Sequence, residues 1–523
     1  MASDRGVFKS TMGLSGATFL SRVLGLIREI LTAQFIGGGM LMSAWALAFT
    51  LPNLFRRILG EGALGTALIP MISHTLEKEG QDSARRKFST IVIWLTFLLA
   101  LITVLVALPA LLIEPYVTTE RWKMALLATP VVMPYCIMIC LIGIATSLLN
   151  SMKQFFLPAM ASLLLNVFLI GALLFFCSGG RKEPVNCLYV LSVAVLLSGL
   201  AEMVVLGWLL KKEGMLPELS GRTLWNAPAI REIWHLALPG LIGMSALQVS
   251  VICDRTIAMA IGNHAVAALY YSDRLIYLPI GIFAVAFGTV SLSLMSRLAA
   301  AGRLKTMLIM MFGSMRQLLF LTVPLAAYMI CFGRELLDLL FRRGAFDTVA
   351  LNESALALYW YAFGIPAFAA TKVTVSGFYS RKDMKTPVLV SIFCIVLNVM
   401  ISISLMDVMR QGGIALATSI TAYLNNFILL YLLRKRLGRM PLKSAGYLFV
   451  QLLVISAVAA LPARYLCTEL EGIGFFAALP KNILSLICAS ALFGAIFTAL
   501  AFLLSIREAR IVTGKLLRRF SKS

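Results

Sequence analysis

Apolar runs of roughly 20 residues recur along the whole chain, and short polar segments separate them. A run of this length can cross the hydrocarbon core of a bilayer as a helix. The pattern predicts about 14 such helices, centred near residues 24, 58, 100, 136, 167, 199, 246, 282, 320, 365, 397, 423, 456 and 492. Because the connecting segments are short, we expect an all-α integral membrane protein with no inserted soluble domain.

The composition agrees with a lipid environment. Of the 523 residues, 60% are hydrophobic and 13% are charged, and the mean hydropathy is +0.90. A soluble protein of this length could not bury that much apolar surface. The first apolar run contains Arg22 and Arg28 and lacks a small-residue cleavage site, so it predicts a retained helix and not a removed signal peptide.

The charge is strongly basic, with 46 Lys and Arg against 24 Asp and Glu and a net charge of +22. If the N-terminus lies in the cytoplasm, about 14 crossings place the most basic segments on that same side. They include EKEGQDSARRK, SRKDMK, LLRKRLGRMPLK and the tail REARIVTGKLLRRFSKS. This asymmetry predicts cytoplasmic N- and C-termini. The basicity therefore indicates topology, and the tail is placed to touch anionic lipid, whereas nucleic-acid binding is not expected.

The cysteines and histidines indicate no metal site. Cys136 and Cys140 lie in one predicted helix without further thiol ligands, and the three histidines form no clustered ligand set. We expect packing or interfacial roles for these residues. Cys177 and Cys187 flank a predicted outside loop, and they would pair only if that side is oxidising.

Two pairs of segments recur in the same order along the chain. GTALIPMIS (65–73) resembles GTVSLSLMS (288–296), and LNSMKQFFLPAMASLLLNV (149–167) resembles YSRKDMKTPVLVSIFCIVLNV (379–399). This order predicts two pseudo-symmetric six-helix lobes of parallel topology, as in transporters with duplicated halves. We expect an N-lobe over residues 1–218, a C-lobe over 219–440, and two further helices with a basic tail over 441–523. Chance similarity between short apolar segments is the alternative.

Ionisable residues lie inside the predicted helices, where each costs about 2.5 to 3.5 kcal/mol at the bilayer centre. Most of them must therefore face protein, water or a ligand. Arg57 and Glu61 are four residues apart on one helix face and can pair. The first two helices still carry an excess of cations, which favours an anionic ligand. The residues concerned are Arg22, Arg28, Arg56, Arg57, Arg255, Arg274, Arg316, Lys372, Glu29, Glu61, Glu202, Asp254 and Asp273.

The first two helices have the features of a polar cavity for an anion. Arginine suits phosphate because its planar group donates two parallel hydrogen bonds and stays charged. Ser21 and Arg28 share one helix face. Pro52 is expected to kink the second helix. Snorkelling near the membrane surface is the alternative role for Arg28 and Arg316. The glycines expected to let backbones approach closely or bend are Gly25, Gly60, Gly62 and Gly65.

Four segments stand out in order along the chain: SRVLGLIRE (21–29), LPNLFRRILGEGAL (51–64), LYYSDRL with the later FGT (269–289), and KVTVSGFYSRKDMKTP (372–387). They closely resemble the signature segments of the MurJ (MviN) family of lipid II flippases, within the multidrug/oligosaccharidyl-lipid/polysaccharide exporter superfamily. The resemblance covers nearly the whole chain. It implies a V-shaped transporter of two six-helix lobes with a central cationic cavity and alternating access. It also implies a groove along the last two helices for the undecaprenyl tail.

The resemblance implies roles for particular residues. Arg22, Arg28, Arg56 and Arg274 correspond to the cavity arginines of the family, and Glu61 corresponds to the acidic residue of RRIxxEG. We add Ser21, Arg57 and Lys372 to the expected substrate-binding set. Leu453 and Leu486 are expected in the tail groove.

The chain departs from some relatives at two places. Some relatives carry an aspartate early in the second helix, where this chain has Ser43. Some also have a sodium site in the second lobe, to which Asp254 could belong, although the neighbouring Arg255 would repel a cation. Coupling of transport to a monovalent ion and coupling to the membrane potential are therefore both open.

The expected cargo is lipid II, the undecaprenyl-diphosphate-linked disaccharide-pentapeptide, and no cofactor or metal is expected. The expected surroundings are the bacterial inner membrane, its lipids and the cell-wall synthesis machinery. A flippase for another polyprenyl-diphosphate glycan is the main alternative. A drug antiporter is disfavoured because a cationic drug would need acidic cavity walls. A lipid-modifying enzyme would need paired carboxylates or a nucleophile with its base, and the sequence shows neither.

Overall fold

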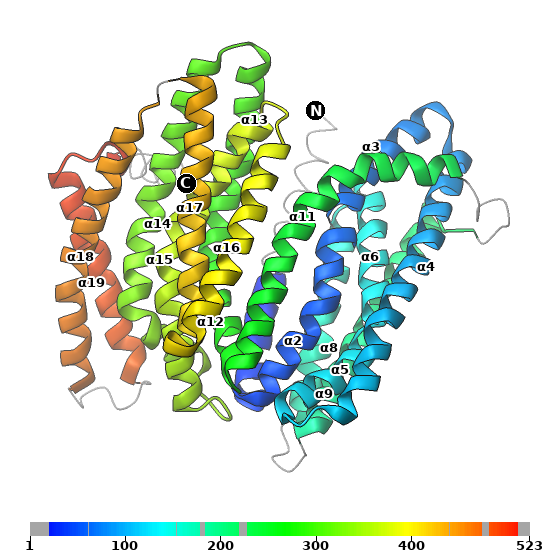
Figure 1. Cartoon of the computed structure of the whole chain (residues 1–523), viewed down its shortest axis with the longest axis horizontal. Helices are drawn as coiled ribbons and strands as arrows, with labels where there is room; N and C mark the ends of the chain where they lie inside the picture. Colours follow the sequence, from blue (N-terminus) through cyan, green and yellow to red (C-terminus); the bar gives the residue numbers. More distant parts are fainter. Residues whose placement is uncertain are drawn as a thin grey trace. The chain divides into compact units, whose positions relative to one another are not determined.

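The computed structural model describes residues 20–60, 62–152, 154–177, 184–218, 227–438, 440–472 and 481–510 (Figure 1). These residues are mostly helical and contain no strand, which confirms the expected all-α class. Among them, nine helices are long and apolar enough to span a membrane, or ten if one bent pair is counted as a single span. The elements are consistent with the expected fourteen crossings, a number that stays a prediction.

By compactness the chain divides into two units. The first comprises Met1–Ala267 and Arg343–Asp347, and the second comprises Ala268–Arg342 and Thr348–Ser523. In the first unit, residues 20–36 are helical. They are followed by α2 (Met40–Phe55), η1 (Arg56–Gly60), α3 (Ala63–Lys78), α4 (Gln81–Ile113), η2 (Glu114–Tyr116), α5 (Glu120–Val132), α6 (Tyr135–Ser151), α7 (Phe156–Ala161), α8 (Leu164–Ala172), η3 (Leu173–Cys177), α9 (Pro184–Lys212) and α11 (Ala227–Ile261).

The second unit contains most of α12 and all the elements after it. These are α12 (Ala265–Pro279), η4 (Ile280–Ala284), α13 (Val285–Ala300), α14 (Leu304–Phe341), α15 (Thr348–Tyr379), α16 (Lys385–Met409), α17 (Gln411–Leu437), α18 (Leu442–Gly472) and α19 (Lys481–Leu503). Helix α11 packs against α3 and α2 of the first unit, although it follows the expected boundary at residues 218 and 219. Compactness and duplication are different criteria, so the lobe boundaries stay a prediction.

The second apolar segment of each half contains a π-helical turn. In the first half α2 runs into η1 and then α3, and in the second half α12 runs into η4 and then α13. Pro52 lies near the end of α2, and Pro279 ends α12. Proline lacks an N–H group and disturbs the hydrogen-bond ladder, which favours such a turn. The run centred near 58 is interrupted after η1, where Gly62 is a turn residue, whereas the run centred near 282 stays helical through η4.

Equivalent packing contacts support the duplication. A Cβ atom added to Gly65 would lie 2.8 Å from the hydroxyl of Ser147 on α6. In the second unit the hydroxyl of Ser376 on α15 donates to the carbonyl of Gly288 at 3.2 Å. Gly65 and Gly288 are the first residues of one repeated pair, and Ser147 and Ser376 lie two and three residues before the other pair begins. The two pseudo-symmetric lobes expected from the repeats are therefore present as a local packing pattern in each half.

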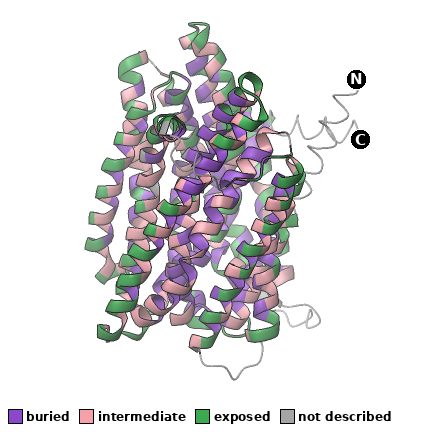
Figure 2. Ribbon diagram, turned by 90° about the vertical axis from the view of Figure 1, so that its right-hand side faces the viewer, coloured by how far each residue is buried: buried purple, intermediate pink, exposed green. Residues whose placement is uncertain are grey.

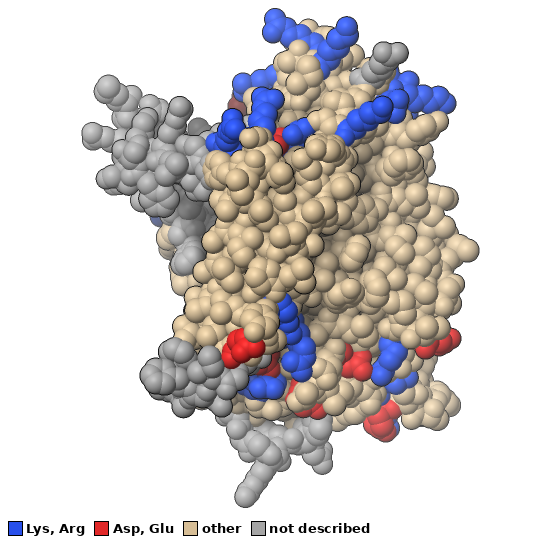
Figure 3. Space-filling model, turned by 90° about the vertical axis from the view of Figure 1, so that its left-hand side faces the viewer, with Lys and Arg blue, Asp and Glu red and all other residues tan. Residues whose placement is uncertain are grey.

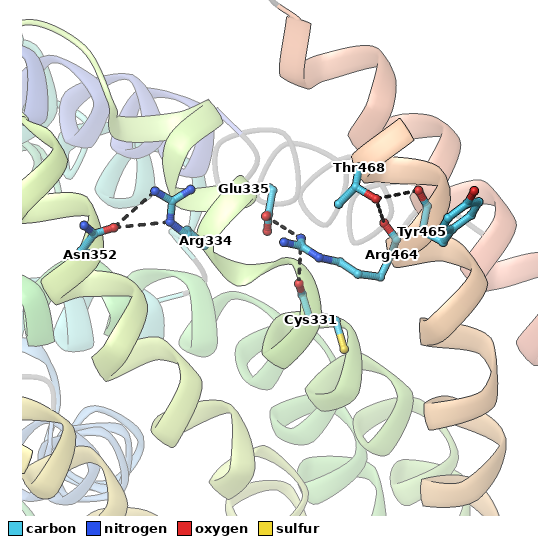
Figure 4. Close-up of polar contacts among 7 residues, drawn as sticks. All are labelled: Cys331, Arg334, Glu335, Asn352, Arg464, Tyr465 and Thr468. Atoms are coloured by element: carbon cyan, nitrogen blue, oxygen red, sulfur yellow. Dashed lines mark hydrogen bonds and ion pairs between the residues drawn. The ribbon is translucent and has the colours of Figure 1, made fainter. Parts of the chain in front are cut away.

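The two C-terminal helices, α18 and α19, pack against each other and against α14. Near one end of α14, Arg316 pairs with Glu508 through N–H···O contacts of 2.6 and 3.1 Å. Near the other end, Arg464 of α18 pairs with the buried Glu335 at 2.5 Å (Figure 4). Between these ion pairs, the hydroxyls of Tyr328 and Ser490 lie 2.6 Å apart. Helices α18 and α19 and the residues after α19 are thus bonded to α14 at three positions, and Arg316 has a structural partner in Glu508.

The surface is organised as expected for a protein in lipid. On the face drawn in Figure 3, charged side chains gather at the two ends and leave a broad band without charge between them. Buried and exposed positions follow one another around individual helices (Figure 2). Many large apolar side chains are exposed, for example Phe97, Val204 and Val396. Such exposure is stable where the solvent is hydrocarbon.

Candidate functional site

The arginines of the first helix have different surroundings. Arg28 donates from Nη1 to Oδ1 of Asn166 at 2.9 Å and from Nη2 to Oε1 of Glu29 at 2.5 Å. Asn166 belongs to α8 and is buried, as is Glu29. Arg22, one turn and a half earlier, is exposed, and Ser21 is half-buried. Arg28 is therefore held in a defined orientation, which argues against a free snorkelling anchor.

The next two arginines lie in the π-helical turn η1. Arg56 is half-buried and Arg57 is exposed. The turn contacts α6 through backbone: a Cβ atom on Gly143 would lie 2.7 Å from the carbonyl carbon of Gly60. A π-helical turn is uncommon and frequently marks a functional site, because it re-aims side chains. Here it carries two adjacent guanidinium groups on a rigid backbone contact.

The expected close approaches at glycines hold with one exception. A Cβ atom on Gly62 would meet the carbonyl of Ile58 at 2.7 Å, and the approaches at Gly60 and Gly65 are given above. At Gly25 a Cβ atom would meet nothing within 4 Å among the described residues, so no close approach is seen there, and the alternative of a bend stays a prediction. Glu61 lies outside the described residues, and its pairing with Arg57 stays a prediction.

In the second unit, Arg274 of α12 is exposed and donates from Nη2 to the hydroxyl of Tyr270 at 2.9 Å. Its guanidinium also lies 4.6 Å from the Tyr270 ring centroid, a cation–π contact that orients it. Lys372 of α15 lies one turn before Ser376, and its Cβ is 3.6 Å from the position of a Cβ on Gly288. In the first half the residue one turn before Ser147 is Gly143. Lys372 of the second half thus takes the place that Gly143 has in the first half, where the backbone of Gly143 packs against Gly60 of η1.

Asp254, the candidate ion ligand, is half-buried on α11. Its neighbour Arg255 donates to the backbone carbonyl of Ala46 on α2 at 3.0 Å. Among the described residues, no group of three or more His, Cys, Asp or Glu is placed to hold a metal ion. The ion site at Asp254 stays a prediction.

Cys177 and Cys187 are not joined by a disulfide bond in the structure.

Ser43 has a role that the sequence did not reveal. Its fully buried hydroxyl donates to the carbonyl of Asn263 at 2.7 Å and accepts from the N–H of Ala267 at 3.1 Å. Ala267 lies in the first turn of α12, so Ser43 caps that helix from α2. Beside it, Nδ1 of His264 donates to the carbonyl of Gly38 at 3.0 Å, a structural contact, and its expected place at the membrane interface stays a prediction. Only the absence of an aspartate drew attention to this position.

Asn166 was also missed as a partner of Arg28. The sequence singled out Leu-Asn only as part of a repeat, and in the second half the equivalent Asn398 donates to the hydroxyl of Thr418 at 3.1 Å.

The two residues expected in the tail groove differ in exposure. Leu453 on α18 is 44% exposed, whereas Leu486 on α19 is 4% exposed and forms part of the packed core. Leu453 is therefore the residue accessible to a lipid tail.

Comparisons with known proteins identify relatives. The sequence model of the family described as "Lipid II flippase MurJ" matches residues 32–485. A "Probable lipid II flippase MurJ" from Rhizobium tropici is 32% identical over 436 residues, covering 81% of this chain and 80% of the relative. The "Lipid II flippase MurJ" from Burkholderia cenocepacia is 30% identical over 464 residues, covering 87% of this chain and 89% of the relative.

Solved structures share the fold. A structure described as "Lipid II flippase MurJ, inward closed conformation" matches with a TM-score of 0.76 and 21% identity, over 94% of this chain and 99% of that one. An inward-facing multidrug resistance MATE family transporter of the MOP superfamily matches with a TM-score of 0.68 and 14% identity, over 82% of this chain and 98% of that one. At these identities the structural likeness establishes the architecture, and the sequence relatives establish the family.

Proposed function

Because this chain belongs to the lipid II flippase MurJ family, we propose that it moves lipid II from the inner to the outer leaflet of the membrane by alternating access. The chain is a multi-pass transporter of the bacterial inner membrane. Lipid II joins a disaccharide-pentapeptide to a polyprenyl chain through a diphosphate. Transport of such an amphiphile needs a polar path for the headgroup and a hydrocarbon path for the tail, and no covalent step.

One observation carries this proposal: guanidinium groups lie within apolar helical segments, and two of them, on Arg28 and Arg274, are oriented by hydrogen bonds. Arg56 and Arg57 lie on the π-helical turn η1, and Arg28 is oriented by Asn166. Arginine at mid-membrane depth is costly unless it meets protein, water or an anion. We assign diphosphate binding to the set Ser21, Arg22, Arg28, Arg56, Arg57, Glu61, Arg274 and Lys372.

The cationic character of this set favours an anionic cargo over a cationic drug. A bidentate arginine contact satisfies two phosphate oxygens at once, whereas an ammonium drug would be repelled. The remaining parts of the proposal follow from the same logic. The tail runs along α18 past Leu453, both chain ends lie in the cytoplasm, and transport draws on the membrane potential or on a monovalent ion at Asp254. The chain acts beside the cell-wall synthesis machinery and needs no cofactor.

Reconstitution tests the proposed function. The purified full-length protein is placed in vesicles with fluorescent lipid II in the inner leaflet, and arrival in the outer leaflet is measured with an impermeant quencher. Translocation faster than in protein-free vesicles, and slowed by Arg56→Ala, is the expected result. Movement of another polyprenyl-diphosphate glycan but not of lipid II would contradict the cargo assignment. Release of phosphate or transfer of the glycan would contradict the transporter assignment.

A further inference from the structure

The first unit contains an apolar hollow of about 260 Å³ between α4, α6 and α9. Leu216 and Pro217, in the segment that follows α9, also line it. Its lining is almost entirely hydrocarbon, and none of its residues belongs to the cationic set assigned to the cargo diphosphate. The walls include Phe88, Ile142, Ala145, Leu206 and Gly207.

The hollow adjoins the lipid-facing surface of the unit. Gly207 lies on α9 between Val204 and Trp208, whose side chains are 71% and 59% exposed. Both α4 and α9 are long and apolar enough to span the membrane. An unfilled void loses the dispersion contacts of its walls, and at this depth the available filler is hydrocarbon. These features favour an acyl chain as the occupant.

Exposed cations lie at the end of the unit where α4 begins and α9 ends. Lys211 and Lys212 end α9, Arg86 lies in the second turn of α4, and Gln81 of α4 donates to the carbonyl of Glu213 at 2.7 Å, which holds these two ends together. Lys212 Nζ lies 5.8 Å from the ring centroid of Trp208, an arrangement typical of the membrane–water interface. A headgroup at this end would meet a surplus of positive charge, which attracts anionic lipid.

Two acidic groups at this end have partners. Glu218 pairs with Arg85 at 2.6 Å, and Glu213 accepts from Gln154 at 3.1 Å, whereas Asp82 lies one turn before Arg86 on α4. Arg85 also donates to the carbonyl of Leu216 at 2.9 Å, which fixes a lining residue of the segment after α9. The segment after α9 is therefore held against α4 by Arg85, and Lys211 and Lys212 are exposed at this end of the unit.

We propose that the hollow between α4, α6 and α9 binds one acyl chain of an anionic phospholipid of the surrounding membrane, with the phosphate headgroup at Lys211, Lys212 and Arg86. This site is separate from the transport of the cargo. Its ligand is a resident lipid with a straight hydrocarbon chain, and its cations lie at the end of the unit where α4 begins and α9 ends.

Photolabelling tests the proposal. The full-length protein is placed in bilayers that contain phosphatidylglycerol with a diazirine in its acyl chain, and labelled peptides are identified by mass spectrometry. We expect labels on the lining segments of α4, α6 and α9. A Cβ at Gly207 meets nothing within 4 Å, so Gly207→Leu should fill the hollow without strain. It should lower labelling of α4 and α6 about tenfold, as expected when two or more methylenes lose their burial.

A matched control is Gly171→Leu on α8, where a Cβ also meets nothing within 4 Å but the residue does not line the hollow. Its labelling should equal that of the wild type. The variant Lys211→Gln/Lys212→Gln should lose the preference for phosphatidylglycerol over a phosphatidylcholine probe. Unchanged labelling in Gly207→Leu would overturn the site. Equal labelling by both probes in the wild type would overturn the anionic headgroup, and displacement by long-tailed lipid II alone would assign the hollow to the cargo.

Discussion

Arg28 and Asn166 are joined by a hydrogen bond of 2.9 Å between Nη1 and Oδ1, which links the first helix to α8. The acceptor is a neutral amide that is 7% exposed. A neutral acceptor orients the guanidinium without adding to the negative charge that Glu29 already brings to it. Arginine has more N–H donors than the bonds to Asn166 and Glu29 use, so the group stays able to bind an anion. The pair therefore has the form of a ligand-binding residue and its positioning partner.

Replacing Asn166 by Asp separates these roles. The carboxylate should keep the contact with Arg28 and make it charge-assisted, so thermal stability should be retained or raised. It should also place a second carboxylate beside Arg28, in addition to Glu29, and so lower lipid II transport about tenfold. Thermal unfolding and vesicle translocation measure the two effects. If transport is unchanged while the fold is intact, Arg28 serves packing only.

The control for this experiment is Asn398→Asp on α16, the equivalent position in the second half. Asn398 donates to Thr418, whose hydroxyl can instead donate to the new carboxylate. We expect transport close to that of the wild type. A loss as large as that of Asn166→Asp would show that any new carboxylate in the helix bundle impairs transport.

The guanidinium shape should matter at Arg56 and Arg274. Alanine at either position should abolish complementation of flippase-depleted cells without loss of inserted protein, and lysine should restore it only in part, because a point charge cannot make a bidentate phosphate contact. The same holds for Arg28. Arg57 is expected to differ, since its predicted pairing with Glu61 would make single removal of either residue impair folding. Normal growth with glutamine at Arg28, Arg56 and Arg274 together would refute the cationic site.

The fold was predictable from the sequence where it depends on long apolar runs. Pro52 indicated a kink in the second helix, but the π-helical turns η1 and η4 themselves were not predictable, because they leave no periodic signal in the sequence. The arginines were found because their cost in lipid demands a reason. The partner of Arg28, Asn166, and the capping role of Ser43 were missed because the contacting residues lie far apart in sequence and only tertiary packing brings them close.

The half-buried carboxyl group of Asp383, outside the membrane-spanning segments, predicts a pH dependence of the folding stability. Burial raises the pKa of Asp383, but hydrogen bonds from Thr386 and from Arg436 outweigh it and hold that pKa below its ordinary value. A lowered folded-state pKa gives stability that is present above the unfolded pKa of about 3.9 and is lost as pH falls through the folded value. Asp383→Asn should therefore lower unfolding free energy by about 1 kcal/mol.

This deficit should be constant between about pH 5 and 8 and shrink below about pH 4, where the wild type loses its carboxylate as well. Thermal unfolding of both proteins in detergent across this range measures it. A deficit that grows as the pH falls would contradict the assigned sign.

The proposed orientation can be tested with introduced cysteines. Most basic segments are predicted on the cytoplasmic side, so a cysteine beside Lys212 or Lys385 should be shielded from an impermeant thiol reagent added outside the cell. A cysteine beside Arg121 or Arg342 should react. The parent chain, with its nine native cysteines, supplies the background. Labelling in the reverse pattern would invert the topology.

The last prediction separates the two ends of the cargo. Leu453 is 44% exposed on α18, so Leu453→Lys should place a charge on the proposed tail path without opening the core. Each methylene of the tail contributes up to about 0.8 kcal/mol when buried. The variant should therefore weaken binding of full-length lipid II much more than binding of a short-tailed analogue, whereas Arg28→Ala and Arg274→Ala should weaken both alike because both ligands keep the diphosphate.

Leu486→Lys is a poorer probe of the tail path, since that residue is only 4% exposed and a charge there would disrupt packing. Val396→Lys on α16, at a position that is 55% exposed, is the matched control and should affect neither ligand. Native mass spectrometry of folded variants compares the affinities, and an equal loss for long and short tails in Leu453→Lys would remove α18 from the tail path.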